Sequence, residues 1–154
     1  MSTSSNIFSL SHDHKPDLPE EYKRITSMGG MVRRMTDENG NDIGGPLRVW
    51  KGKENYPGLA MSRSLGDMYA KSCSVIPIPQ FVEYTLNNTT RYMTICSDGV
   101  WEFLSNEQVT QIGNPFYSKD DIQGHCQSLI INAMKMWENQ DVIRDDITAV
   151  VVYF

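Results

Sequence analysis

Apolar residues fall into short runs and one long helical stripe, a pattern that predicts strands and helices in a single chain. Tyr92–Cys96 is short, β-prone and bounded by turn residues, which predicts a buried strand. The last residues, 147–154, are almost continuously apolar and predict a strand that is buried on both faces. Apolar residues at helical spacing along Ile122–Glu138 predict an amphipathic helix, which we expect Ser118 and Asp121 to cap.

Shorter elements are predicted from turn and capping signals. Residues 81–86 can form a strand, and we expect it to pair with Tyr92–Cys96 as a hairpin across the turn at 87–90. Ser105 and Gln108 have the spacing of a capping box, so a short helix is expected to begin there. Residues 7–11, 31–35 and 47–50 are further expected strands.

Residues 17–58 are polar and glycine-rich compared with the rest of the chain. A helix is expected at the start of this region, because Asp17 can cap it, Pro19 stands in its first turn and Gly29 with Gly30 ends it. The remainder has the composition of mobile loops. We therefore expect residues 17–58 to be a surface excursion and not part of the core.

Composition indicates one globular domain, or part of a larger one, of 154 residues with a net charge of −5. The basic residues form no long run, which argues against a nucleic-acid surface. No run approaches the length that spans a bilayer, and the first residues lack the apolar segment of a signal peptide. Its odd number of widely spaced cysteines suggests no disulfide framework. We expect an intracellular protein, in the cytoplasm or nucleus, with no membrane and no nucleic-acid partner.

Two patterns contain residues that can bind metal. His12 and His14 would share one face of an extended strand, but an ordinary strand end explains them better. Asp98 follows one predicted strand and Asp145 precedes another, so their carboxylates converge if the strands are antiparallel neighbours. Such a pair of oxygen ligands favours Mg²⁺ or Mn²⁺, the other interpretation being solvated turn acids.

Three motifs in order resemble the PP2C-type family of metal-dependent Ser/Thr protein phosphatases. They are the residues 59–67 (LAMSRSLGD), 96–102 (CSDGVWE) and 145–148 (DDIT), preceded by 13–16 (DHKP). The resemblance implies an α+β fold, part of a four-layer α-β-β-α sandwich with antiparallel sheets. By position it implies that Asp98 and Asp145 are metal ligands, and that Glu102 contributes to an additional, weaker metal site.

The same resemblance implies a function and an incomplete site. It implies hydrolysis of phosphoserine and phosphothreonine in phosphoprotein substrates by a water that two Mg²⁺ or Mn²⁺ ions activate. Residues 17–58 would be the family's flap, and Arg63 is closer to a structural role than to phosphate binding. The family's N-terminal half, with its phosphate-binding arginine and bridging aspartate, has no counterpart in residues 1–154. No catalytic residue is identifiable on this chain, and we expect the chain alone to be inactive.

The sequence is consistent with several hypotheses about assembly and function. Half of a sandwich would present unpaired strand edges and uncovered apolar faces, so we expect self-association, pairing with a separate N-terminal half, or a longer parent protein. The leading function is the C-terminal part of a protein phosphatase. The alternative is a non-catalytic regulatory or binding form of the same fold, and another two-metal phosphohydrolase ranks third.

Overall fold

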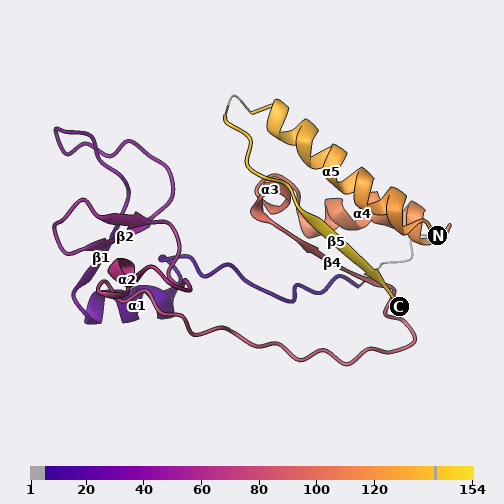
Figure 1. The fold of residues 1–154 in the computed structure, drawn as a ribbon, viewed down its shortest axis with the longest axis horizontal. Helices are drawn as coiled ribbons and strands as arrows, with labels where there is room; N and C mark the ends of the chain where they lie inside the picture. Colours follow the sequence, from indigo (N-terminus) through magenta and orange to yellow (C-terminus); the bar gives the residue numbers. More distant parts are fainter. Residues whose placement is uncertain (1–5, 141) are drawn as a thin grey trace. The chain divides into compact units, whose positions relative to one another are not determined.

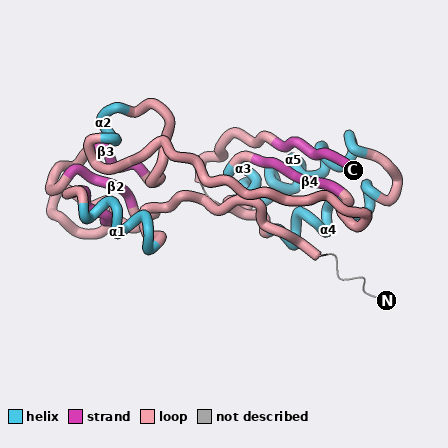
Figure 2. Tube along the Cα trace, turned by 90° about the horizontal axis from the view of Figure 1, so that it is seen from below, coloured by secondary structure: helices cyan, strands magenta, loops and turns pink. Residues whose placement is uncertain are grey.

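A computed structural model describes residues 6–140 and 142–154 of the chain. The chain divides into two compact units. One unit consists of residues 10–82, and the other is built on residues 83–154 together with the segment that ends at Ser9. Helices and strands occur in both (Figures 1 and 2).

The unit of residues 10–82 combines a three-stranded antiparallel sheet with two helices. In chain order its elements are α1 (Pro19–Ser27), β1 (Gly30–Arg33), β2 (Arg48–Lys51), β3 (Pro57–Leu59) and α2 (Met68–Lys71). The sheet order is β1-β2-β3. The strands expected at 31–35 and 47–50 are thus present with shifted ends. The α1 helix has its proline in the first turn as expected, but Leu18 and not Asp17 is the N-cap residue.

This unit has a hydrophobic core of its own. Ile25, Val49 and Ala70 are fully buried, and Cys73 and Val75 are almost so. Ile25 and Val49 belong to residues 17–58, so the expectation that this whole region lies at the surface is wrong. The apolar side chains of this region recur on one face of a helix or strand, so they form a core although the sequence around them is polar. The role of the region as a flap stays a prediction.

A buried carboxylate with two arginine partners links α1 to the residues after β3. The Glu21 side chain is 3% exposed, and it accepts hydrogen bonds from Arg63 Nη2 at 2.6 Å and from Ser62 Oγ at 2.5 Å. Arg24 Nη1 lies 2.8 Å from Glu21 Oε2, and the same guanidinium donates to the carbonyl of Ser62 at 2.8 Å. Burial by itself raises the pKa of Glu21, but the hydrogen bonds from Arg63, Ser62 and Arg24 outweigh it and lower that pKa to about 2.

The second unit packs helices on a two-stranded antiparallel ribbon. Its elements are β4 (Tyr92–Cys96), α3 (Asp98–Trp101), α4 (Asn106–Tyr117), α5 (Ile122–Glu138) and β5 (Ala149–Tyr153). The strands β4 and β5 pair directly, and α5 packs along β5 (Figure 1). The capping box of Ser105 and Gln108 is present as predicted. Asp121 alone caps α5, because the Ser118 hydroxyl donates instead to the carbonyl of Asn114 in α4.

The core of this unit lies between the helices and one face of the ribbon. Its buried members come from α3, α4, α5, β5 and the turn after α3, namely Val100, Leu104, Val109, Leu129, Ala133 and Val151. His125 is also fully buried, with its Nδ1 atom 3.1 Å from the hydroxyl of Tyr153. Gly113 contacts the His125 ring so closely that a Cβ atom would collide with it. Burial lowers the pKa of His125, so the neutral imidazole is the favoured form.

Three expectations about strands are wrong. Residues 81–86 form no strand, and β4 pairs with β5 instead. The β5 strand has three consecutive β-branched residues at 150–152, whereas the charged Glu83 interrupts the 81–86 segment. Residues 7–11 form no strand either. The β5 strand is not buried on both faces, since Val150 is 48% exposed and its partner Ile95 is 54% exposed. The helices of this unit cover the opposite face.

We expect Glu21→Gln to lower the free energy of unfolding by about 3 kcal/mol at pH 7, because Arg63 and Arg24 lose their buried counter-charge. The pKa of Glu21 is lower in the folded state, so its contribution is complete above the usual carboxyl pKa of 4.5 and disappears as the pH falls towards 2. Urea unfolding at pH 7 and pH 3 measures both effects. The exposed neighbour Glu20→Gln is the matched control, and an equal loss in that variant would contradict the assignment.

Candidate metal centre

The end of β4 and the approach to β5 are joined by hydrogen bonds beyond the strands themselves. The register places Cys96 opposite Ala149. Beyond that pair, the backbone amide of Ser97 donates to the carbonyl of Thr148 at 3.0 Å. The Ser97 hydroxyl accepts from the amide of Thr148 at 3.0 Å and donates to the carbonyl of Asp146 at 3.0 Å. Ser97 therefore extends the pairing and fixes the 146–148 segment against the start of α3.

Gly99 brings the two segments into direct contact. A Cβ atom at this position would collide with the carbonyl oxygen of Asp146, so only glycine fits here without displacement. The carbonyl of Gly99 in turn accepts a hydrogen bond of 2.7 Å from the indole Nε1 of Trp137 in α5. Trp101 Nε1 donates to the carbonyl of Cys96 at 3.0 Å. The turn that carries Asp98 is thus held by the ribbon, by the 146–148 segment and by α5.

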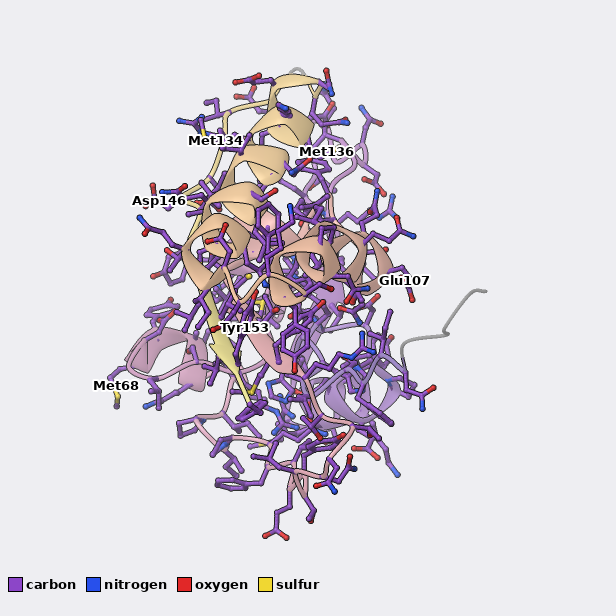
Figure 3. All side chains as sticks on the ribbon, turned by 90° about the vertical axis from the view of Figure 1, so that its right-hand side faces the viewer. Met68, Glu107, Met134, Met136, Asp146 and Tyr153 are labelled. Carbon is purple, nitrogen blue, oxygen red and sulfur yellow. The ribbon has the colours of Figure 1, made fainter. Side chains whose placement is uncertain are left out.

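The contacts of Ser97 and Gly99 with the 146–148 segment form a junction between two segments of the chain. The three predicted ligands lie on these two segments. Asp98 is the first residue of α3 and is exposed. Glu102 is the C-cap residue of α3, and its amide donates to the Asp98 carbonyl at 2.8 Å, so the two residues stand one helical turn apart on the same side. Asp145 is also exposed, and its Oδ1 accepts from the amide of Asp146 at 2.7 Å. Asp146, beside it, is labelled in Figure 3.

The residue types fit a hard divalent cation, although they supply only part of its coordination shell. Exposed carboxylate oxygens are the ligands that Mg²⁺ and Mn²⁺ prefer, and such ions usually retain several waters. Within residues 6–140 and 142–154, no three His, Cys, Asp or Glu side chains gather closely enough to hold an ion. A site at Asp98 and Asp145 would therefore need further ligands from water, substrate or other protein residues.

The histidine pair at 12 and 14 forms no metal site among the described residues, and Arg63 has a structural role. His12 and His14 line a hollow of about 610 Å³ in the 10–82 unit, together with Glu21 and Arg63, but the described residues form no metal-binding cluster there. Arg63 donates to Glu21 and, through Nη1, to the carbonyl of Ile78 at 3.0 Å. These contacts fit the structural role that was expected of this arginine.

Sequence reasoning missed the residues that position the predicted ligands. Ser97 and Gly99 stand inside a motif that was used only to locate Asp98, and their contacts to Asp146 depend on a segment almost fifty residues away. Trp137 is one of the apolar residues of the helix predicted at Ile122–Glu138, and that pattern alone assigns it no contact with the Asp98 turn. A tryptophan nitrogen usually has a hydrogen-bond acceptor when it is buried, and this is the signal that could have pointed to such a contact.

No helix in the described part of the chain combines the length and the apolar character needed to cross a membrane.

Comparison with known proteins identifies the family. The sequence profile of "Protein phosphatase 2C" matches residues 1–142. The rice protein "Probable protein phosphatase 2C 12" is 47% identical over 103 residues, which are 67% of this chain and 25% of the relative. The rice "Probable protein phosphatase 2C 48" is 32% identical over 147 residues, covering 94% of this chain and 39% of the relative. The chain thus spans well under half the length of these relatives.

Solved structures agree on the fold. The crystal structure of serine-threonine phosphatase 2C from Toxoplasma gondii matches 94% of this chain and 46% of its own, with a TM-score of 0.78 and 25% sequence identity. A C. elegans sex-determining protein matches 94% of this chain and 31% of its own, with a TM-score of 0.71 and 20% identity, and it supports the fold alone. The predicted mixed α+β class with antiparallel sheets is confirmed, and the chain belongs to the protein phosphatase 2C family.

Proposed function

We propose that this chain is part of a metal-dependent protein phosphatase that hydrolyses phosphoserine and phosphothreonine. In this proposal Asp98 and Asp145 are ligands of a Mg²⁺ or Mn²⁺ centre, which holds two ions in the complete domain. Glu102 contributes to an additional, weaker site. The observation that supports the proposal best is the junction at Ser97 and Gly99, because it brings the segments of both aspartates together.

Each residue of the junction has a definite part in this chemistry. Divalent ions, when bound, lower the pKa of water and neutralise the negative charge of a phosphoryl group. Asp98 and Asp145 would hold such an ion through carboxylate oxygens, without acting as acids or bases. Ser97 orients the backbone of both segments, and Trp137 fixes the carbonyl of Gly99. A ligand set that is fixed before the metal arrives loses less conformational entropy on binding.

The remainder of the centre must come from outside the described residues of this chain. Two carboxylate positions cannot hold two ions, so we propose that the chain alone is inactive and acts with the other ligands of a complete domain. Self-association and pairing with an N-terminal half are the two ways of completing it. The exposed Ile95 and Val150 side chains on the uncovered face of the ribbon are compatible with either. An intracellular location, in the cytoplasm or nucleus, agrees with the three free cysteines.

The alternative function is a non-catalytic regulatory or binding form of the fold. It is favoured by one observation, that no three metal-binding side chains cluster among the residues described. Titration with Mn²⁺ separates the two proposals. A binding form needs no ion shared by Asp98 and Asp145, whereas the phosphatase does.

We expect Asp98→Asn to weaken Mn²⁺ binding to the 154-residue chain at least about tenfold, because a neutral amide oxygen replaces a charged ligand. Isothermal titration calorimetry measures the change. Asp120→Asn is the matched control, since Asp120 is exposed in the same unit and its positive φ of 56° suits asparagine. Equal Mn²⁺ affinity in the Asp98→Asn and wild-type chains would contradict the ligand assignment.

We expect Gly99→Ala to weaken Mn²⁺ binding although it removes no carboxylate. The added Cβ meets the Asp146 carbonyl, so the Asp98 turn must move away from the 145–148 segment. Gly113→Ala provides the control for general destabilisation, because its Cβ would meet the buried His125 ring in the same unit. Thermal unfolding should show a lower Tm in both variants. A parallel loss of Mn²⁺ affinity in both would show that the effect is not specific to the junction.

A further inference from the structure

The sheet of the 10–82 unit presents two arginines side by side on the face opposite its core. Arg33 of β1 stands directly across from Arg48 of β2, and Val32 stands across from Val49. Residues directly opposite in an antiparallel pair share one face, and neighbours along a strand alternate between faces. Val49 and Val32 belong to the core side. Arg33 and Arg48 therefore project together on the other side.

Both guanidinium groups are held in place by neutral partners. The Arg33 guanidinium lies 4.1 Å from the centre of the Trp50 ring, and its Nη2 donates to Asn55 Oδ1 at 2.7 Å. Arg48 Nη1 donates to the carbonyl of Gly58 at 2.7 Å. The Trp50 ring is wedged against Gly58, where a Cβ atom would approach it to 2.9 Å. Stacking and hydrogen bonding thus fix the two side chains before any ligand binds.

The positive charge of this pair is not compensated by the described residues around it. Like charges directly opposite each other destabilise a sheet. No carboxylate of the described chain forms an ion pair with Arg33 or Arg48, although other arginines and lysines of this unit have such partners. The carboxylate of nearby Glu54 is engaged elsewhere, with Oε1 3.8 Å from Lys51 Nζ and Oε2 accepting from the Tyr69 hydroxyl at 3.3 Å.

The geometry points to an anion site: we infer that Arg33 and Arg48 together bind a phosphate group carried by a segment of the protein substrate. Guanidinium forks donate two parallel hydrogen bonds to phosphate oxygens. Beyond the donors already used, no hydrogen bond within the described chain occupies Arg33 Nε, Arg48 Nε or Arg48 Nη2. A phosphate monoester carries close to two negative charges at pH 7 and can balance both arginines, whereas a single carboxylate balances one. The source of the phosphate rests on the proposed phosphatase function.

Calorimetry with the 154-residue chain in buffer containing EDTA tests this site independently of metal binding. The probe is a short peptide with one phosphoserine, compared with the unphosphorylated peptide, a glutamate-substituted peptide and inorganic phosphate. We expect Arg48→Gln and Arg33→Gln each to weaken phosphopeptide binding about tenfold, the usual effect of losing a hydrogen bond to a charged group. Arg34→Gln is the matched control, because it removes the same charge at the adjacent exposed position.

The outcomes separate clearly. Tenfold weaker binding in the Arg33 and Arg48 variants, with Arg34→Gln unchanged, supports the site. An equal loss in Arg34→Gln, no binding by the wild-type chain, or binding of the glutamate peptide as tight as that of the phosphopeptide would each overturn it. Inorganic phosphate binding as tightly as the peptide would overturn the assignment to a protein segment.

A further variant guards against misfolding. Arg48→Lys retains the charge but lacks the planar fork, so it should also bind more weakly even if circular dichroism shows that Arg48→Gln does not fold. The site and the phosphatase function fail separately. Phosphopeptide binding in EDTA without Mn²⁺-dependent ester hydrolysis by the complete domain would count against the phosphatase, and the reverse result against the arginine pair.

Discussion

The antiparallel pairing of β4 with β5, continued by the hydroxyl of Ser97, is the interaction on which the proposed metal centre depends. The strands end at Cys96 and begin at Ala149. Without a further link, the two segments could separate immediately beyond that pair. The Ser97 side chain accepts from one residue of the 146–148 segment and donates to another, and Gly99 leaves no room between them. Two segments that are almost fifty residues apart in sequence, each carrying a predicted ligand, are therefore in direct contact.

The 10–82 unit depends on a different kind of constraint, a buried ion that its neighbours satisfy. An unpaired buried carboxylate would be very costly, but Glu21 accepts from two arginines and a serine. Those partners come from α1 itself and from the residues after β3, so the carboxylate joins α1 to the 62–63 segment. Arg63 thereby has its charge balanced within the fold, in contrast to Arg33 and Arg48 on the outer face of the sheet. This contrast distinguishes a structural arginine from one available to a ligand.

Local signals predicted the local features of the fold. The bounds of β4 and α5 and the capping box of α4 follow from periodicity and from contacts over a few residues. The pairing of β4 with β5 did not follow from such local signals. Residues 81–86 are closer to β4 in sequence, and closing the short loop of a hairpin costs less conformational entropy. The exposed outer face of β5 could not be predicted either. An apolar run shows that a strand can be buried on both faces, but it does not show which other elements cover those faces. The motif positions predicted Asp98, Asp145 and Glu102 as metal ligands, and that assignment remains a prediction. The contacts of Ser97, Gly99 and Trp137 could be found only in the structure.

The most direct test is whether one bound cation lies close to both Asp98 and Asp145. Substoichiometric Mn²⁺ broadens NMR signals of nuclei close to it, so amide spectra of the 154-residue chain report its neighbours residue by residue. We predict that the amide signals of Asp98 and Asp145 broaden together at the same Mn²⁺ concentration, while those of the exposed acids Asp120 and Asp121 stay sharp. Broadening of only one of the two, or equal broadening of all four, would contradict the proposed centre.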